Sequence, residues 1–279
     1  MALTGDQIQH YRDKGYVSPI RVLDDDDVAA RRSKLEAIER GDPEAAAALK
    51  FKPHLVFTFL DDLIRHPKVL DAVEGVIGEN ILCWSANFFT KEPKTTNYIS
   101  WHQDLTYWGL EPADIVTAWI ALSPATVASG CMRFVPGSHK MDVVPHNDTF
   151  AADNMLTRGQ EISVDVDEND AIDVILQPGE MSLHHVKLIH GSNANGSSDR
   201  RIGFAIRYVP AYVRQVVGDK DSAVLVRGTD TERNFEHETP PSADLDPAAL
   251  AQQTAIMKRH EAILFRNTDR GYARDPREG

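Results

Sequence analysis

The stretch that decides the fold class spans residues 115–137 and reads IVTAWIALSPATVASGCMRFVPG. Two short runs rich in apolar and β-branched residues, 115–122 and 131–135, are separated by Ser-Pro and followed by Pro-Gly. Runs of this length between turn residues are typical of β-strands. The stretch therefore predicts two strands of a sheet.

Short apolar runs separated by turn residues continue on both sides of this stretch. We expect further strands near residues 80–90, 162–166, 172–176, 181–184 and 201–209. Many short strands in one block favour a sandwich or jelly roll over a sheet built from βαβ units.

Helical patterns frame the strands. Thr4 and Gln7 form a capping-box pattern at the start of a helix, which Gly15 ends. Further helices are predicted over residues 25–40, over 57–77 with a division at Pro67, and over 246–265.

These patterns predict a single domain over residues 1–279. It has a helical N-terminal part (1–79), a strand-rich core (about 80–212) and a C-terminal extension (213–279). Segments 138–160 and 218–245 are polar and aperiodic, so we expect functional loops there.

Composition excludes several classes of protein. The net charge of -12, with no basic run, argues against a nucleic-acid partner. No apolar run is long enough for a membrane span, and no signal-peptide pattern is present, so we expect a cytoplasmic protein. Cys83 and Cys131 lie in apolar contexts and predict neither a disulfide framework nor a zinc site.

A candidate metal site comes from Trp101-His102-Gln103-Asp104 together with His190. Side chains two residues apart on an extended segment point the same way, so His102 and Asp104 can bind one metal ion. His190 follows a strand-like run and can supply the third ligand. Two imidazoles and one carboxylate form the facial triad of non-haem iron(II) oxygenases.

Arg201 lies eleven residues after His190. A strand–turn–strand of this length can place its side chain in the same cavity. A guanidinium group binds a carboxylate at two points, which suits the distal carboxylate of 2-oxoglutarate. Ser192 can add a hydroxyl group to this contact.

These motifs resemble the phytanoyl-CoA dioxygenase superfamily. The resemblance covers roughly residues 4–212 and includes Thr117-Ala118-Trp119-Ile120-Ala121-Leu122, Val135-Pro136-Gly137-Ser138-His139-Lys140 and His190-Gly191-Ser192. It implies a double-stranded β-helix (jelly-roll, cupin-like) core with flanking helices, and an enzyme that uses iron(II), 2-oxoglutarate and O2.

The resemblance also implies roles for individual residues. His102, Asp104 and His190 would be the iron ligands, and Arg201 the 2-oxoglutarate anchor. Positions that line the co-substrate are matched by Ser192, Trp119 and, less closely, Asn87. Relatives that chlorinate have a small residue in place of the ligand acid, so Asp104 favours hydroxylation or a related oxidation over halogenation. The small size of the chain and the absence of a basic patch for a carrier protein favour a free small molecule as substrate.

Several alternatives stay open on the sequence. His184 or His185 could replace His190 as a ligand, and His184 shares its strand parity. Substrate contacts from Lys52, His54, Trp108 or Arg207 are undecided. The other histidines are expected to be structural or on the surface, namely His10, His66, His139, His146, His237 and His260.

Two other functions compete with the oxygenase. One is a cupin-type metalloenzyme that does not use 2-oxoglutarate, and the other is a non-catalytic ligand-binding jelly roll. The substrate itself has no readable motif.

Overall fold

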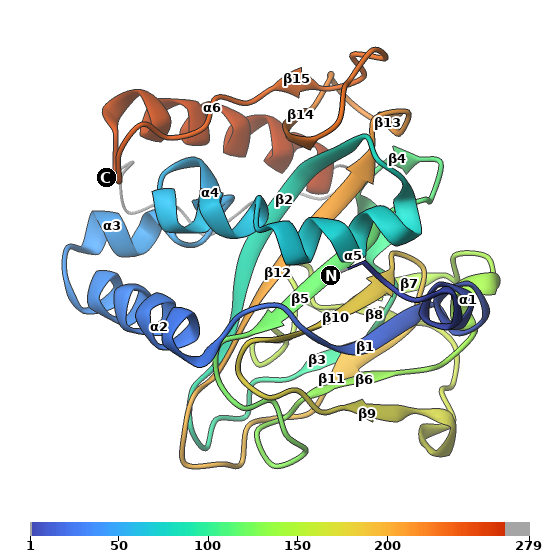
Figure 1. Cartoon of the computed structure of the whole chain (residues 1–279). Coiled ribbons are helices and arrows are strands. Elements are labelled where there is room, and N and C mark those ends of the chain that lie inside the picture. The colour runs from blue at the N-terminus through green and yellow to red at the C-terminus, as the bar shows by residue number, and fades with distance from the viewer. Residues whose placement is uncertain (1, 266–279) are drawn as a thin grey trace.

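The computed structural model describes residues 2–265, and its largest element is a seven-stranded sheet (Figure 1). Neighbouring strands are antiparallel except for the last pair. In spatial order the strands are β1 (Tyr16–Arg21), β10 (Glu180–His185), β5 (Val116–Ala121), β12 (Arg201–Pro210), β2 (Ile81–Lys91), β14 (Ser222–Arg227) and β15 (Glu236–His237).

A four-stranded sheet packs against one face of the large sheet. Its order is β3 (Ile99–His102), β11 (His190–Ser192), β6 (Met132–Phe134) and β9 (Ile172–Val174). Two small ribbons pair β4 (Leu110–Glu111) with β13 (Arg214–Gln215), and β7 (His146–Asp148) with β8 (Gln160–Ile162). The predicted β-rich jelly roll with flanking helices is confirmed.

Helices cover the other face of the large sheet (Figure 1). They are α1 (Gly5–Lys14), α2 (Asp25–Arg40), α3 (Pro43–Ala48), α4 (Thr58–Ile64) and α5 (Pro67–Ile77). The last helix, α6 (Pro247–Leu264), packs against the 3-10 turn Pro53–Leu55. Further 3-10 turns span Asp104–Tyr107, Ser138–Lys140 and Glu168–Asp170. The expected capping box of Thr4 and Gln7 and the division at Pro67 are both present.

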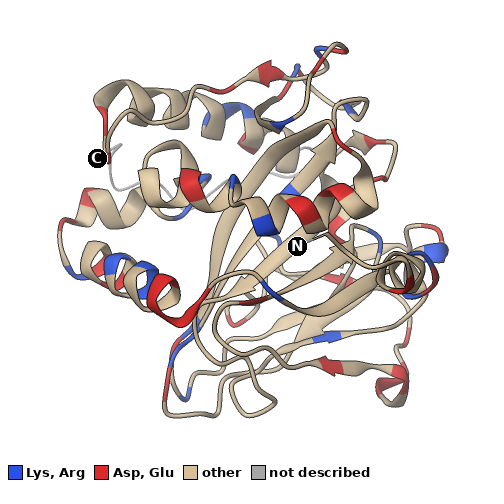
Figure 2. Ribbon diagram, in the orientation of Figure 1, with Lys and Arg blue, Asp and Glu red and all other residues tan. Residues whose placement is uncertain are grey.

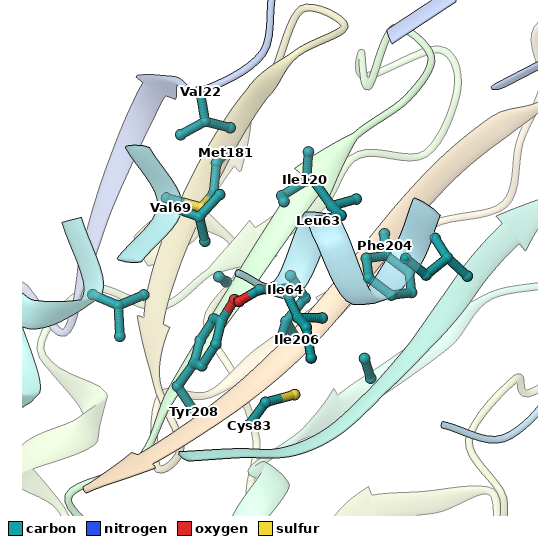
Figure 3. Close-up of a cluster of buried hydrophobic side chains, with 14 of the residues drawn as sticks. Val22, Leu63, Ile64, Val69, Cys83, Ile120, Met181, Phe204, Ile206 and Tyr208 are labelled. Carbon is teal, nitrogen blue, oxygen red and sulfur yellow. The ribbon is translucent and has the colours of Figure 1, made fainter. Parts of the chain in front are cut away.

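The main core lies between these helices and the sheet. Side chains alternate along a strand, and Phe204, Ile206 and Tyr208 of β12 point towards the helices. Figure 3 shows Tyr208 beside Ile64 of α4, whose backbone carbonyl accepts a hydrogen bond of 2.8 Å from the phenol. This bond satisfies the one polar atom of a fully buried ring.

The opposite face of the large sheet forms the interior of the sandwich. Trp119 and Ala205 pack there against Met132 and Phe134 of the small sheet. Arg201 and Arg207 of β12 share this parity, so the same alternation that buries the apolar core directs two arginines inward.

The large sheet extends beyond the predicted strand-rich core of residues 80–212. β1 comes from the part predicted to be helical, and it pairs with β10. β14 lies in the segment predicted to be the loop 218–245, and it pairs with β2. The strand expected at 162–166 is wrong in position, because β8 ends at Ile162 and belongs to a ribbon with β7.

Charged residues gather on α1, α2 and the surface loops, while the strands of the large sheet carry few (Figure 2). Cys83 and Cys131 are buried and free, as expected. Among the helices described between residues 2 and 265, none is both long and apolar enough to span a membrane.

Gly203 of β12 lies under the indole of Trp119. A methyl group at residue 203 would sit 1.8 Å from Trp119 Cζ2, within a fully buried strand. We expect Gly203→Ala to lower the free energy of unfolding by about 1–3 kcal/mol, because the indole must move. Urea unfolding measures the change.

Gly5→Ala is the matched control, because nothing lies within 4 Å of the added methyl group. It should leave the unfolding midpoint nearly unchanged. An equally small effect of Gly203→Ala would contradict the packing described for Trp119.

Candidate metal and co-substrate site

Two neighbouring strands of the small sheet bring the predicted ligands together. His102 on β3 and His190 on β11 are direct cross-strand partners. Asp104 begins the 3-10 turn that follows β3. One ligand atom from each of the three residues lies within 4.8 Å of the others, so the group can hold a metal ion.

Hydrogen bonds to the backbone orient both imidazoles. The Nδ1 atom of His102 lies 2.9 Å from the carbonyl oxygen of Ser100, and that of His190 lies 2.9 Å from that of Leu188. When Nδ1–H donates to a carbonyl, the free electron pair of the ring is on Nε2. This arrangement is typical of metal-binding histidines.

The carboxylate of Asp104 is held among these rings. Its Oδ1 lies 3.4 Å from His102 Nε2, and its Oδ2 accepts a hydrogen bond of 3.3 Å from Thr117 on β5. Burial alone would raise the pKa of Asp104. The neighbouring His102, His190 and Arg207 outweigh burial and hold the pKa of Asp104 well below its usual range.

Burial, and secondarily His102, lowers the pKa of His190 to about 4. At neutral pH the site therefore has an anionic carboxylate and a neutral imidazole at His190. These are the protonation states that metal ligands require.

His184 on β10 lines the same cavity without joining the group of three. Its Nε2 lies 4.0 Å from Asp104 Oδ2, and its ring centroid lies 4.8 Å from that of His190. Neither ring nitrogen has a hydrogen-bond partner within the described residues. His185 points away and lies against His139 and Tyr11.

A small cavity of about 30 Å³ adjoins the metal-binding group. The side chains of Arg201, Ser192 and Trp119 line it together with the three candidate ligands. The Arg201 Cζ atom lies 5.3 Å from the centre of the Trp119 ring.

Arg201 is fully buried, yet Nε and both Nη atoms have no hydrogen-bond partner in residues 2–265. Burial lowers its pKa to about 10, so it remains a cation at neutral pH. A buried unpaired guanidinium group is unfavourable unless an anion meets it. A carboxylate can supply both the negative charge and two hydrogen-bond acceptors to this guanidinium group.

Arg200 faces the other way, as the strand parity predicts. Its guanidinium group pairs with Glu39 and Glu92 near the surface. The orientation predicted for Arg200 therefore matches the structure.

A larger cavity of about 320 Å³ lies next to the small one. Asp104, Arg207, Phe89 and Leu156 line both cavities. Asn87 lines the larger cavity and not the smaller one, and it accepts a hydrogen bond from Arg207.

Aromatic residues form much of the wall of the larger cavity. The guanidinium carbon of Arg207 lies 5.6 Å from the centre of Phe89 and 5.7 Å from that of Trp108. Trp108 in turn packs against Trp84, with 4.9 Å between ring centroids. Arg207 and Trp108, which the sequence left undecided, both line this cavity.

The helix α6 supplies a wall that the sequence did not indicate. Gln253, Met257, His260 and Leu264 all line the larger cavity. The expected surface position of His260 is wrong, because its ring packs against Trp84 and Phe51. No motif in α6 distinguishes these residues from an ordinary packing face.

His146 also departs from its expected surface position. It is partly buried, and its Nε2 accepts a hydrogen bond of 3.1 Å from the backbone of Gln103, between two candidate ligands. His139 is structural as expected, because its Nε2 contacts the carbonyl of Arg12 at 3.1 Å.

Lys52 lines the larger cavity, but its ammonium group is bound elsewhere. Nζ lies 2.5 Å from Glu238 Oε1 and 3.0 Å from the carbonyl oxygen of Ser222. His54 is buried on the other side of the same carboxylate, with 3.8 Å between His54 Nε2 and Glu238 Oε2. Both residues thus connect the N-terminal part to the C-terminal strands.

A jelly roll with a buried His-Asp-His group defines the class of iron(II)- and 2-oxoglutarate-dependent oxygenases. The family model for phytanoyl-CoA dioxygenase (PhyH) matches residues 11–203, and the chain belongs to this family. It is therefore an enzyme of the Fe(II)/2-oxoglutarate-dependent dioxygenases, and iron(II) and 2-oxoglutarate are the family's cofactors.

Three relatives illustrate the similarity. The apo structure of the non-heme monooxygenase ThoJ is 34% identical, with a TM-score of 0.84, covering 93% of this chain and 97% of that one. The probable alpha-ketoglutarate-dependent hypophosphite dioxygenase of Stutzerimonas stutzeri is 27% identical over 234 residues, 76% of this chain and 81% of the relative. The peroxisomal phytanoyl-CoA dioxygenase of Homo sapiens is 27% identical over 236 residues, 75% and 69% of the two chains.

Removal of any one candidate ligand tests the metal site. We expect His102→Ala, Asp104→Ala and His190→Ala each to abolish activity and most iron binding, because two ligands hold iron(II) poorly. Iron content after anaerobic reconstitution is the measurement. His185→Ala should keep its iron, since that ring points away from the group. Full iron content in His190→Ala, with loss in His184→Ala, would reassign the third ligand.

Proposed function

We propose that this enzyme hydroxylates a small molecule, with release of succinate and CO2. His102, Asp104 and His190 would hold iron(II). Arg201 would bind the distal carboxylate of 2-oxoglutarate, with Ser192 and Trp119 beside it. Iron(II), 2-oxoglutarate and O2 together supply the oxidising power.

One observation carries this proposal. A buried arginine without a hydrogen-bond partner among the described residues lines the same small cavity as the three candidate ligands. A metalloenzyme that did not use 2-oxoglutarate would have no reason to leave this cation uncompensated. A ligand-binding jelly roll without metal would not require the orientation of both imidazoles.

The remaining side chains bind and shield the reactants. Trp119 covers one side of the Arg201 guanidinium group and keeps water from it. Thr117 fixes the carboxylate of Asp104 by its hydrogen bond. The larger cavity, which meets the smaller one at Asp104 and Arg207, is where the substrate would bind.

The proposal is tested most directly by a panel of small molecules. Purified enzyme with iron(II), 2-oxoglutarate and O2 should release succinate in proportion to substrate consumed. Oxidation of a panel substrate without any requirement for 2-oxoglutarate would favour the cupin-type reaction instead.

The two adjacent arginines provide a matched pair of variants. Arg201→Ala should weaken 2-oxoglutarate binding by about 3–5 kcal/mol, because the carboxylate loses its partner in a buried site. Arg200→Ala should leave 2-oxoglutarate binding unchanged, because its partners lie outside the cavity. Titration of both variants with 2-oxoglutarate measures the difference, and the reverse ranking would contradict the proposed anchor.

Asp104 also predicts the reaction outcome. Asp104 would hold iron(II) where a halogenating enzyme would bind a halide. The product should therefore gain one oxygen atom, or derive from such an oxygenated product, and contain no halogen. Mass spectrometry of products formed in bromide-rich buffer under oxygen-18 gas measures both. A halogenated product would overturn the ligand role of Asp104.

A further inference from the structure

His184 is a buried polar side chain to which the proposed function gives no role. It lies on β10, where Met181 and Leu183 point into the helical core and His184 points the other way, into the small cavity. The side chain is 1% exposed, and neither ring nitrogen has a hydrogen-bond partner in the part of the chain that the structure describes. A buried polar group is unfavourable unless a partner meets it. The position of the ring therefore indicates a partner inside the cavity.

The ring of His184 is held beside Asp104. Its centroid lies 5.2 Å from that of Phe134 and 4.8 Å from that of His190, so two aromatic rings of the small sheet pack against it. Its Nε2 lies 4.0 Å from Asp104 Oδ2. This distance exceeds that of a hydrogen bond by about 1 Å. A small rotation of either side chain is enough to close the gap.

Thr117 contacts the same oxygen from the neighbouring strand. Thr117 on β5 and His184 on β10 are directly opposed in the register of the large sheet. Directly opposed residues place their side chains on the same face of a sheet. The Thr117 hydroxyl donates a hydrogen bond of 3.3 Å to Asp104 Oδ2. Two side chains of the large sheet thus converge on one carboxylate oxygen.

The other oxygen of Asp104 faces the candidate metal ligands. Its Oδ1 lies 3.4 Å from Nε2 of His102, which belongs to the small sheet. The two oxygens are therefore placed differently, since Oδ1 faces an imidazole ligand and Oδ2 faces the side chains of the large sheet. A carboxylate placed in this way can offer Oδ1 to a metal ion while Oδ2 accepts hydrogen bonds.

We propose that His184 is a positioning residue for the metal site, and that its Nε2–H holds Asp104 Oδ2 so that Oδ1 is directed at iron(II). The inference rests on the ligand role proposed for Asp104. Backbone carbonyls orient the imidazoles of His102 and His190, and side chains of the large sheet orient the carboxylate. The site is therefore assembled from both sheets.

Two other roles for His184 lead to different expectations. A structural histidine would stabilise the metal-free chain, so its removal would lower stability. A fourth iron ligand would be replaced poorly by an amide, which is a weaker ligand than an imidazole. A positioning donor differs from both. Its ring has no partner in the described part of the metal-free chain, so an apolar side chain there should cost the fold little.

Iron(II) affinity and metal-free stability, measured on the same variants, separate these roles. His184→Leu should weaken iron(II) binding by about tenfold to a hundredfold, the usual effect of losing a hydrogen bond to a ligand. Anaerobic titration against a competing chelator measures this change. The urea midpoint of the metal-free His184→Leu chain should not fall. His184→Gln, whose amide places an N–H near the position of Nε2, should restore most of the affinity.

His185→Leu is the matched control, because the neighbouring ring points away from the site. Its Nδ1 accepts a hydrogen bond of 3.1 Å from the backbone N–H of Lys187. The control should therefore lower the urea midpoint and leave the iron(II) affinity unchanged. This is the reverse of the pattern expected for His184→Leu.

The remaining outcomes contradict the inference. Unchanged iron(II) affinity in His184→Leu would overturn it. A parallel fall of affinity and metal-free stability would show a structural role instead. If His184→Gln bound iron(II) no better than His184→Leu, the ring would act on the metal itself rather than through Asp104. Failure of the unaltered chain to bind iron(II) at all would refute the proposed metal site.

Discussion

The two-residue repeat of side chains along β12 is the constraint on which the rest of the structure depends. Helices cover one face of this strand and the small sheet covers the other, so all ten of its residues are buried. A shift of register by one residue would point Phe204 and Tyr208 towards the cavity instead of the core. The same shift would remove Arg201 and Arg207 from the cavity. The stability of the core and the position of Arg201 are therefore fixed together.

The small sheet adds the complementary half of the site. His102 and His190 face each other because β3 and β11 pair in this register, and each ring is fixed by the backbone carbonyl two residues earlier in the chain. Short strands suffice for this purpose, since each ligand and the carbonyl that orients it are only two residues apart. The candidate metal group is thus a local consequence of strand pairing.

Much of this was predictable from the sequence, for identifiable reasons. In an extended backbone, the His-x-Asp spacing directs both side chains the same way, and Arg200 and Arg201 point to opposite faces. The short apolar runs in the sequence indicate this extended backbone. The strand β14 was missed because its six residues lie within a polar segment and owe their conformation to pairing with β2. The cavity wall formed by α6 was equally hidden, because periodicity marks a buried helix face without saying which surface it covers. His260 on α6 was placed on the surface for the same reason, and His146 because the segment 138–160 shows no periodicity.

The buried pair of Lys52 and Glu238 joins regions of the chain 186 residues apart. Glu238 lies beyond the family match, which ends at residue 203, whereas Lys52 lies inside it. If the later segment were missing, a buried ammonium group would lose its counter-charge, which typically costs about 3–5 kcal/mol. The part shared with the family is for this reason no independent module. Grafting a different C-terminal segment onto it would require a new acid at the same place, or an uncharged residue at position 52.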